Sequence, residues 1–296
     1  KWFNTNYHYI VPEISKETTF KLNSKKIIEE YEEAKELGIK TKINLLGPIT
    51  YLGLSKSIDN SDVFFHINNV VKVYKELLEE ISKFDDEIIV QFDEPLFVRD
   101  IDTKILSLIK PVYDELSNAV TNIKIVVASY FEHSNEASKI LVNTPIWALA
   151  LDFIYGEKNI ESLDFIKNSN KTLIAGVIDG RNIWKSDFKK KIDLLEKISK
   201  HINKDKLIIS TTCSLLHVPF SLKYEDHLSK EIKSWLAFAC EKLNELSLVS
   251  KDFFDIQLNL DEISIIKRNL EDNIQRKTSS KIHNLEIQNE IKNLKL

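Results

Sequence analysis

The chain has few of the residues that crosslink or interrupt a fold. Its 296 residues include no Met, two Cys, six Gly and six Pro. Cys213 and Cys240 are too few for a disulfide framework, which excludes a small disulfide-stabilised domain and favours a reducing, cytoplasmic setting. No apolar run approaches the ~20 residues that a membrane-spanning helix needs, so no membrane partner is expected. Nothing in the pattern explains the missing Met.

An excess of positive charge is also absent. The chain has 41 Lys and Arg against 45 Asp and Glu, a formal net charge of −4. Without a basic field, nucleic acid is not expected as a partner. Hydrophobic residues make up 43% and charged residues 29%, which is typical of a globular protein. The length suits one large domain, such as an α/β barrel.

Short apolar runs are present at regular intervals and predict parallel strands. They are nearly continuous rather than alternating, as expected for strands buried on both faces. Six of them lie at 42–46, 87–91, 123–128, 147–151, 172–178 and 207–210, and a seventh strand is predicted at 7–11. Stretches with helical periodicity separate them, at 27–37, 67–81 and 188–198, and one long late helix is predicted over 232–246.

Strands that alternate with helices predict an α/β fold, either a (β/α)8 TIM-type barrel or a doubly wound sheet. No GxGxxG motif or P-loop follows any strand, which favours the barrel. Seven strands are one short of closure, so we expect a barrel that lacks its first βα unit, before Lys1. We expect this barrel to span residues 1–250. Residues 251–296 are polar and predict a helical linker or a frayed terminus.

The first thirteen residues, KWFNTNYHYIVPE, combine four aromatic side chains with several hydrogen-bonding ones. A buried core strand would not need so many donors and acceptors, and a surface strand would not need so many aromatics. Apolar faces beside a few polar groups are typical of the rim of a binding pocket. Lys1 alone would be interpreted as an ordinary solvated lysine.

Polar residues at the carboxyl ends of the strands are the candidate site residues, because active sites lie at that end of a barrel. Asp93 and Glu94 follow one strand and could serve as a general acid or base, as in glycosidases. Because no matched partner carboxylate is evident, we favour a structural role, in which the carboxylate bonds to loop backbone or to Arg181. Asp152 follows another strand.

Two further motifs lie near strand ends. Asp179–Gly180–Arg181–Asn182 has the composition of a tight turn, although Arg181 could also clamp a carboxylate. Cys213 and His217 lie four residues apart, but two ligands do not make a zinc site and a nucleophile–base pair needs an orienting group. Packing is therefore the favoured role for both.

Six motifs in order resemble the N-terminal domain of cobalamin-independent methionine synthase. They are KWFNTNYHYIVPE (1–13), LLGPITYL (45–52), VQFDEP (90–95), AGVIDGRNIW (175–184), STTCSLLHVP (210–219) and EIKSWLAFACEKLNEL (231–246). The resemblance covers most of residues 1–250. It implies the N-terminal barrel of a two-barrel methyltransferase, with residues 251–296 leading toward the second barrel.

The resemblance also implies an activity and its partners. Members transfer the methyl group of 5-methyltetrahydropteroyltri-L-glutamate to L-homocysteine, which forms methionine. A zinc ion in the C-terminal barrel binds the homocysteine sulfur, so neither metal ligands nor catalytic residues are expected in this chain, which alone should be inactive. The N-terminal barrel helps to bind the folate polyglutamate, and the family's lysine contact falls on Lys1. By resemblance, Asp93 and Glu94 are mainly structural.

Two alternatives to this function remain open. The chain could be a non-catalytic folate-binding barrel module. It could instead be an unrelated barrel hydrolase that uses Asp93 or Glu94, provided that a second carboxylate faces them across the barrel mouth.

Overall fold

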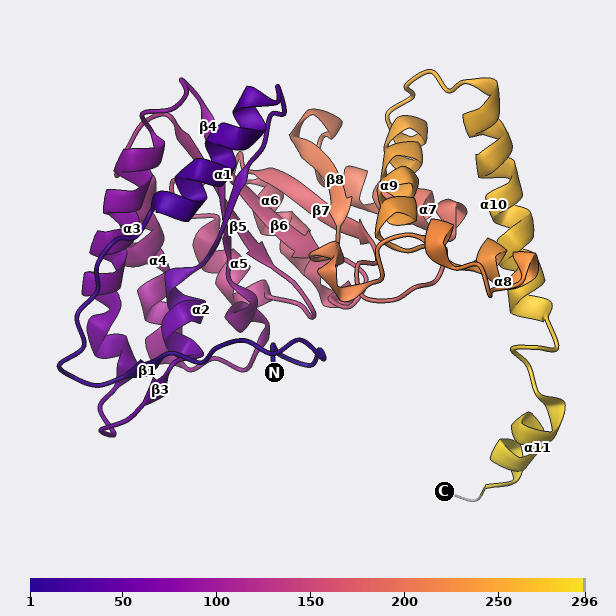
Figure 1. Ribbon diagram of the computed structural model, residues 1–296, viewed down its shortest axis with the longest axis horizontal. Helices are drawn as coiled ribbons and strands as arrows, with labels where there is room; N and C mark the ends of the chain where they lie inside the picture. Colours follow the sequence, from indigo (N-terminus) through magenta and orange to yellow (C-terminus); the bar gives the residue numbers. More distant parts are fainter. Residues whose placement is uncertain (295–296) are drawn as a thin grey trace. The chain divides into compact units, whose positions relative to one another are not determined.

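The computed structural model describes residues 1–294 and divides into two compact units. The first unit contains Lys1–Gly176 and Ile198–Cys213, and the second contains Val177–Lys197 and the chain from Ser214 onward. Figure 1 shows the elements of both units, coloured along the chain. Within the described residues, no helix is both long enough and apolar enough to cross a membrane.

A parallel sheet of six strands is the centre of the first unit. The strands are β2 (Ile43–Leu46), β4 (Ile88–Asp93), β5 (Ile123–Ser129), β6 (Ala148–Asp152), β7 (Thr172–Ile178) and β8 (Leu207–Thr211). Their order across the sheet, β2-β4-β5-β6-β7-β8, is their order along the chain. The four pairs from β2–β4 to β6–β7 are parallel. A doubly wound sheet would reverse its strand order at a switch point, so this order is that of a TIM-type barrel.

These six strands confirm the predictions made from continuous apolar runs. Residues of β7 are buried throughout, as expected for a strand covered on both faces. The predicted strand at 7–11 is wrong. The chain there has no regular structure, and Ile10 is 95% exposed. The first short strand is instead β1 (Glu13–Ile14), which pairs with β3 (Lys56–Ser57) outside the main sheet.

Helices follow the strands of the first unit along the chain. Their bounds are α1 Lys25–Glu36, α2 Pro48–Gly53, α3 Ile67–Ile81, α4 Thr103–Ser117, α5 Asn135–Leu141 and α6 Leu163–Lys167. Helix α3 buries one apolar stripe, which includes Val70, Leu77 and Leu78. Each such side chain stabilises the fold by about 1.5–3 kcal/mol. Helices α3 and α4 pack against each other, and α4 also contacts β5 (Figure 1).

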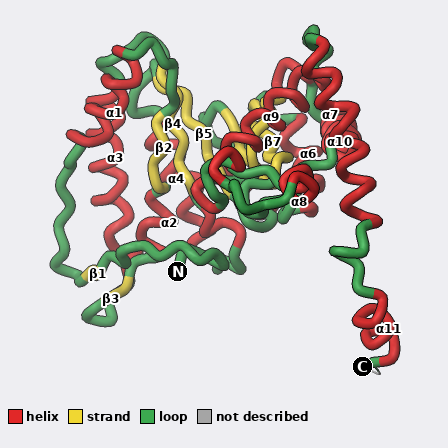
Figure 2. Tube along the Cα trace, turned by 45° about the vertical axis from the view of Figure 1, so that its right-hand side comes forward, coloured by secondary structure: helices red, strands yellow, loops and turns green. Residues whose placement is uncertain are grey.

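The second unit is mainly helical. Its helices are α7 (Phe188–Ser199, whose last residues cross into the first unit), α8 (Lys230–Trp235), α9 (Ala239–Phe253), α10 (Leu260–Thr278) and α11 (Leu285–Asn293). Helices α9 and α10 lie side by side in both views (Figures 1 and 2). That residues 251–296 lead toward a further domain stays a prediction.

The single late helix predicted over 232–246 is wrong, because the chain breaks between α8 and α9. Residues 236–238 are extended there, and Leu236 forms an antiparallel bridge with Trp184. The N–H of Ala237 donates to the carbonyl of Ile183 at 2.8 Å. Helical periodicity continued through the break, so the pattern alone could not reveal it.

Candidate functional site

Several polar and aromatic side chains gather at the carboxyl ends of the strands in the first unit. Asp93 ends β4, Tyr130 follows β5, Asp152 ends β6 and Cys213 follows β8. In TIM-type folds this edge carries the ligand-binding and catalytic groups. The candidate site is therefore built from this edge and from the N-terminal segment that packs on it.

A chain of polar contacts leads along the sheet to Asp93. The Lys42 ammonium donates to the Gln91 side chain, and the Gln91 amide donates to Asp93 Oδ1 at 2.7 Å. Gln91 and Asp93 are two residues apart in β4 and so share one face. Burial raises the pKa of Asp93 and lowers the pKa of Lys42, although their mutual attraction opposes both shifts. The four-carbon stem of Lys42 thus brings a cation toward a carboxylate inside the unit.

Tyr130 connects Asp93 to the N-terminal segment. Its hydroxyl donates to Asp93 Oδ2 at 3.2 Å, and the Trp2 side chain hydrogen-bonds to Tyr130. Burial and the nearby carboxylate of Asp93 raise the pKa of Tyr130. The tyrosine therefore stays protonated and acts as a donor.

The N-terminal segment folds into a tight turn. The Trp2 N–H donates to the Tyr7 carbonyl at 2.7 Å, and the buried Thr5 hydroxyl donates to the Trp2 carbonyl at 2.6 Å. Phe3 has a positive φ of 50°, which this turn imposes on a residue with a side chain. The turn fixes the ring of Trp2 next to Phe3 and Tyr9, with centroids 5.2 and 5.6 Å apart.

An aromatic cluster joins this turn to the end of β5. The rings of Phe3 and Phe131 are 6.0 Å apart, and those of Tyr130 and Phe131 are 4.7 Å apart. Cys213 is buried in the same cluster. The Arg99 guanidinium lies 4.6 Å from the centroid of the Phe3 ring, a cation–π geometry that adds positive charge beside the turn. Lys1 is exposed next to Trp2.

Glu94 is placed differently from its neighbour Asp93. It is fully buried, and its carboxylate accepts the Ile49 N–H at 3.1 Å, the Thr50 N–H at 2.6 Å and the Tyr113 hydroxyl at 2.8 Å. The two N–H groups belong to the first turn of α2, where a carboxylate is favourable. Burial raises the pKa of Glu94 to about 7. This geometry favours a structural role for Glu94, and its backbone donors belong to a helix, where loop backbone or Arg181 was the predicted partner.

The candidate residues are divided between the two units. Arg181 belongs to the second unit, in a turn where Asp179 Oδ1 accepts the N–H of Arg181 at 2.8 Å. Cys213 belongs to the first unit and His217 to the second. Burial and the charge of Arg181 lower the pKa of His217.

Sequence reasoning missed Arg99, Lys42 and Gln91 as members of the site. Gln91 could have been found, because residues two apart in a strand share a face and Asp93 was already a candidate. The contacts of Arg99 and Lys42 depend on tertiary packing and leave no signal in the sequence.

No group of three or more His, Cys, Asp and Glu side chains within residues 1–294 is arranged to hold a metal ion. The zinc that the resemblance implies belongs to the C-terminal barrel, and where that ion is held stays a prediction.

The fold is that of a barrel-type α/β protein. A solved structure described as a B12-independent methionine synthase from Shewanella sp. W3-18-1, in complex with selenomethionine, aligns with a TM-score of 0.61. It is 20% identical and the alignment covers 80% of this chain and 70% of that chain, so it supports the fold alone.

Residues 1–203 match the family model described as the N-terminal domain of cobalamin-independent synthase, and the chain belongs to this family. A 5-methyltetrahydropteroyltriglutamate–homocysteine methyltransferase of Desulforamulus reducens is 49% identical over 296 residues, all of this chain and 38% of the relative. A relative of that name from Flavobacterium johnsoniae is 38% identical over 295 residues, 97% of this chain and 38% of the relative. The chain thus spans well under half the length of these relatives.

Proposed function

We propose that this chain is the N-terminal barrel of a methyltransferase that acts on 5-methyltetrahydropteroyltri-L-glutamate and L-homocysteine and forms methionine. The observation that carries the proposal is the 49% identity to a relative with that name over every residue of the chain. The methyl transfer is assigned to the second barrel that the resemblance implies, along with the zinc ion and homocysteine. The family membership leaves the unrelated hydrolase without support, and Glu94 is occupied by three donors.

Within this enzyme, we assign to the present chain the binding of the folate polyglutamate tail. Each glutamate of the tail carries a carboxylate, and the chain as a whole has a net charge of −4. Cations are therefore needed locally. Lys1 precedes Trp2 in the chain, and the Arg99 guanidinium lies against the Phe3 ring, so both supply positive charge near this aromatic pair. Trp2 and Phe3 are fixed by packing against the aromatic cluster. Charged donors of this kind recognise carboxylates at short range.

A Lys1→Ala change in the full-length enzyme tests this assignment. We expect affinity for triglutamyl folate to fall about tenfold, roughly 1.4 kcal/mol, because one charge-assisted contact is lost. Affinity for the monoglutamyl form should fall less than about twofold, since it carries fewer carboxylates. Isothermal titration calorimetry with both substrates measures the difference. Lys139→Ala, which alters an exposed lysine of α5, is the matched control. Equal losses for both substrates would contradict a contact to the tail.

The division of labour between the barrels gives a separate prediction. Residues 1–296 purified alone should transfer no methyl group and should hold no stoichiometric zinc, because the residues present do not form a metal site within the described range. Elemental analysis of the dialysed protein and a methionine-formation assay measure this. One tightly held zinc per chain would refute the assignment of zinc to the other barrel.

A further inference from the structure

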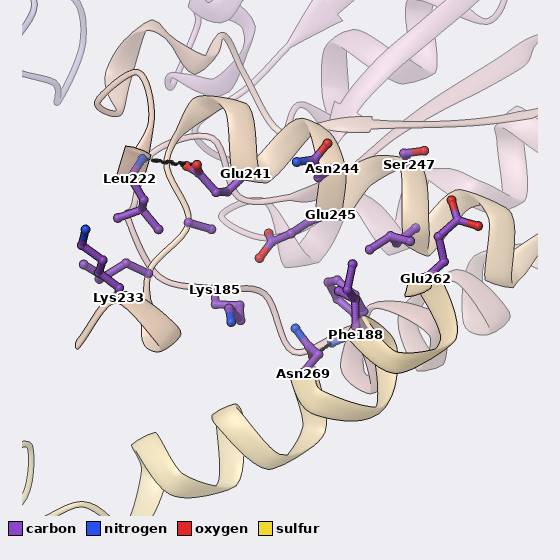
Figure 3. A pocket seen from close by; sticks show the side chains of 14 residues that line it. Lys185, Phe188, Leu222, Lys233, Glu241, Asn244, Glu245, Ser247, Glu262 and Asn269 are labelled. Atoms are coloured by element: carbon purple, nitrogen blue, oxygen red, sulfur yellow. Dashed lines mark hydrogen bonds between the residues drawn. The ribbon is translucent and has the colours of Figure 1, made fainter. Parts of the chain in front are cut away.

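The second unit contains a cavity of about 470 Å³ that the proposed function does not use. Residues of α9 and α10 and of the segments around Lys185 and Leu236 line it. Figure 3 shows it from close by, with Lys185, Glu245 and Asn269 among the labelled lining residues. Its inner lining is apolar and consists of the buried side chains Phe188, Leu236, Ala237 and Leu248. The volume lies within the range of about 300–1,000 Å³ that is typical of small-molecule sites.

One buried carboxylate belongs to the lining beside these apolar side chains. Glu245 is 5% exposed, and its Oε1 accepts the Ser186 N–H at 2.9 Å. The other oxygen, Oε2, is buried and has no hydrogen-bond partner among the described residues. In Figure 3 the Glu245 carboxylate lies in the middle of the lining residues and points into the space between them. A buried oxygen without a donor costs about 1–3 kcal/mol, which a suitable ligand would recover.

Three other charged groups of the lining already have partners, and a fourth, Lys233, lies at the margin of the view in Figure 3, away from Glu245. Glu241 accepts the N–H groups of Leu222 and Phe238, and Figure 3 marks the contact with Leu222. Glu262 pairs with Lys251 at 2.5 Å, and Lys185 pairs with Asp272 at 2.6 Å. Among the carboxylate oxygens of this lining, Glu245 Oε2 is therefore the one that is buried and without a partner among the described residues.

The charge near Glu245 decides what the ligand must supply. Burial raises the pKa of Glu245, while the charges of Lys242 and Lys185 attract its carboxylate and oppose that shift. A ligand thus needs to bring a hydrogen-bond donor to Oε2 rather than a full compensating charge. A ligand that offers only acceptors would place its oxygen against the carboxylate.

We propose that this cavity binds a small ligand with an apolar body and one N–H donor group, an ammonium or an amide, and that this group donates to Glu245 Oε2. The apolar body fills the space against Phe188, Leu236 and Leu248. This site is separate from the folate tail assigned above and does not depend on that assignment.

Three probes of similar size test the site: benzylammonium, benzamide and benzoate. In titration calorimetry on the intact chain, we expect the two N–H donors to bind saturably in the millimolar range. Benzoate, which offers only acceptors at neutral pH, should bind at least tenfold more weakly. This comparison uses the unmodified protein, so it does not depend on how any variant folds.

A Glu245→Gln change should invert the preference. Its amide oxygen still accepts the Ser186 N–H, so the amide NH2 group then points into the cavity and favours benzoate over benzylammonium. Glu271→Gln, an exposed position of α10, is the control and should keep the original order. Circular dichroism checks that both variants fold. Equal binding of the three probes, no saturable binding by either donor, or an unchanged preference in a folded Glu245→Gln variant would each overturn the proposal.

Discussion

Replacing Glu94 by Ala should destabilise the first unit by about 3–5 kcal/mol, the usual cost of removing one partner from a buried charged network. The change leaves the N–H groups of Ile49 and Thr50 and the hydroxyl of Tyr113 without their acceptor in a fully buried place. It also removes the carboxylate that caps the first turn of α2. Urea unfolding followed by circular dichroism at pH 8 measures the loss.

Glu79→Ala is the matched control, because that side chain is exposed on α3 and should change the free energy of unfolding by less than about 0.5 kcal/mol. A second test comes from Gly47. A Cβ atom there would lie 2.2 Å from the Glu94 carboxyl carbon, so Gly47→Ala should disturb the same cap. If the Glu94→Ala variant unfolds at the same urea concentration as the Glu79→Ala control, the Glu94 carboxylate does not stabilise α2.

The raised pKa of Glu94 makes its effect depend on pH. The unfolded glutamate ionises near its ordinary pKa of 4.5, whereas folded Glu94 keeps its proton up to a pKa of about 7. Between these values the folded state binds more protons, so stability falls as the pH rises. Relative to Glu94→Gln, which does not titrate, the wild type should lose about 3 kcal/mol between pH 4.5 and 7. A flat difference across this range would show that Glu94 ionises normally.

Asp93 and Glu94 also show what the sequence could predict about the site. Neighbouring residues at a strand end point to opposite sides, so one could have been placed inside the sheet and the other against the helices. The partners of each come from distant segments. Lys42, just before β2, reaches Asp93 through Gln91, and Tyr130, just after β5, bonds to it directly. No spacing in the sequence predicts these contacts.

The sequence pattern predicted those elements whose residues are buried on both faces. It did not predict those elements whose limits depend on a single hydrogen bond or bridge. Continuous apolar runs predicted all six strands of the main sheet, because a strand buried on both faces has no polar side. The strand predicted at 7–11 failed because the bond from Trp2 to Tyr7 closes a turn just before it and Ile10 stays exposed. The break before α9 likewise depends on a bridge to Trp184.

The second large effect is expected for Asp152→Ala, at the end of β6. Asp152 is fully buried and accepts three backbone N–H groups, from Phe131 at 3.2 Å, Ile154 at 2.8 Å and Tyr155 at 2.9 Å. Each donor left without a partner costs about 1–3 kcal/mol, so we expect a total loss of about 3–4 kcal/mol. Urea unfolding measures it, with the exposed Asp164→Ala as a control for loss of charge.

This loss should reach the proposed folate site, because Asp152 accepts the N–H of Phe131, which has an unusual conformation. Phe131 has a φ of 88°, which costs about 1–3 kcal/mol for a residue with a side chain unless its surroundings impose it. Its ring contacts Phe3, next to Trp2 and Lys1. Once the N–H of Phe131 is released, the residue can relax and the N-terminal turn loses its support.

We therefore expect Asp152→Ala in the full-length enzyme to weaken triglutamyl folate binding at least as much as Lys1→Ala does. Near-ultraviolet circular dichroism should show loss of the aromatic cluster. Unchanged folate affinity in a variant whose aromatic signal has collapsed would mean that the turn binds the tail without Phe131 beneath it.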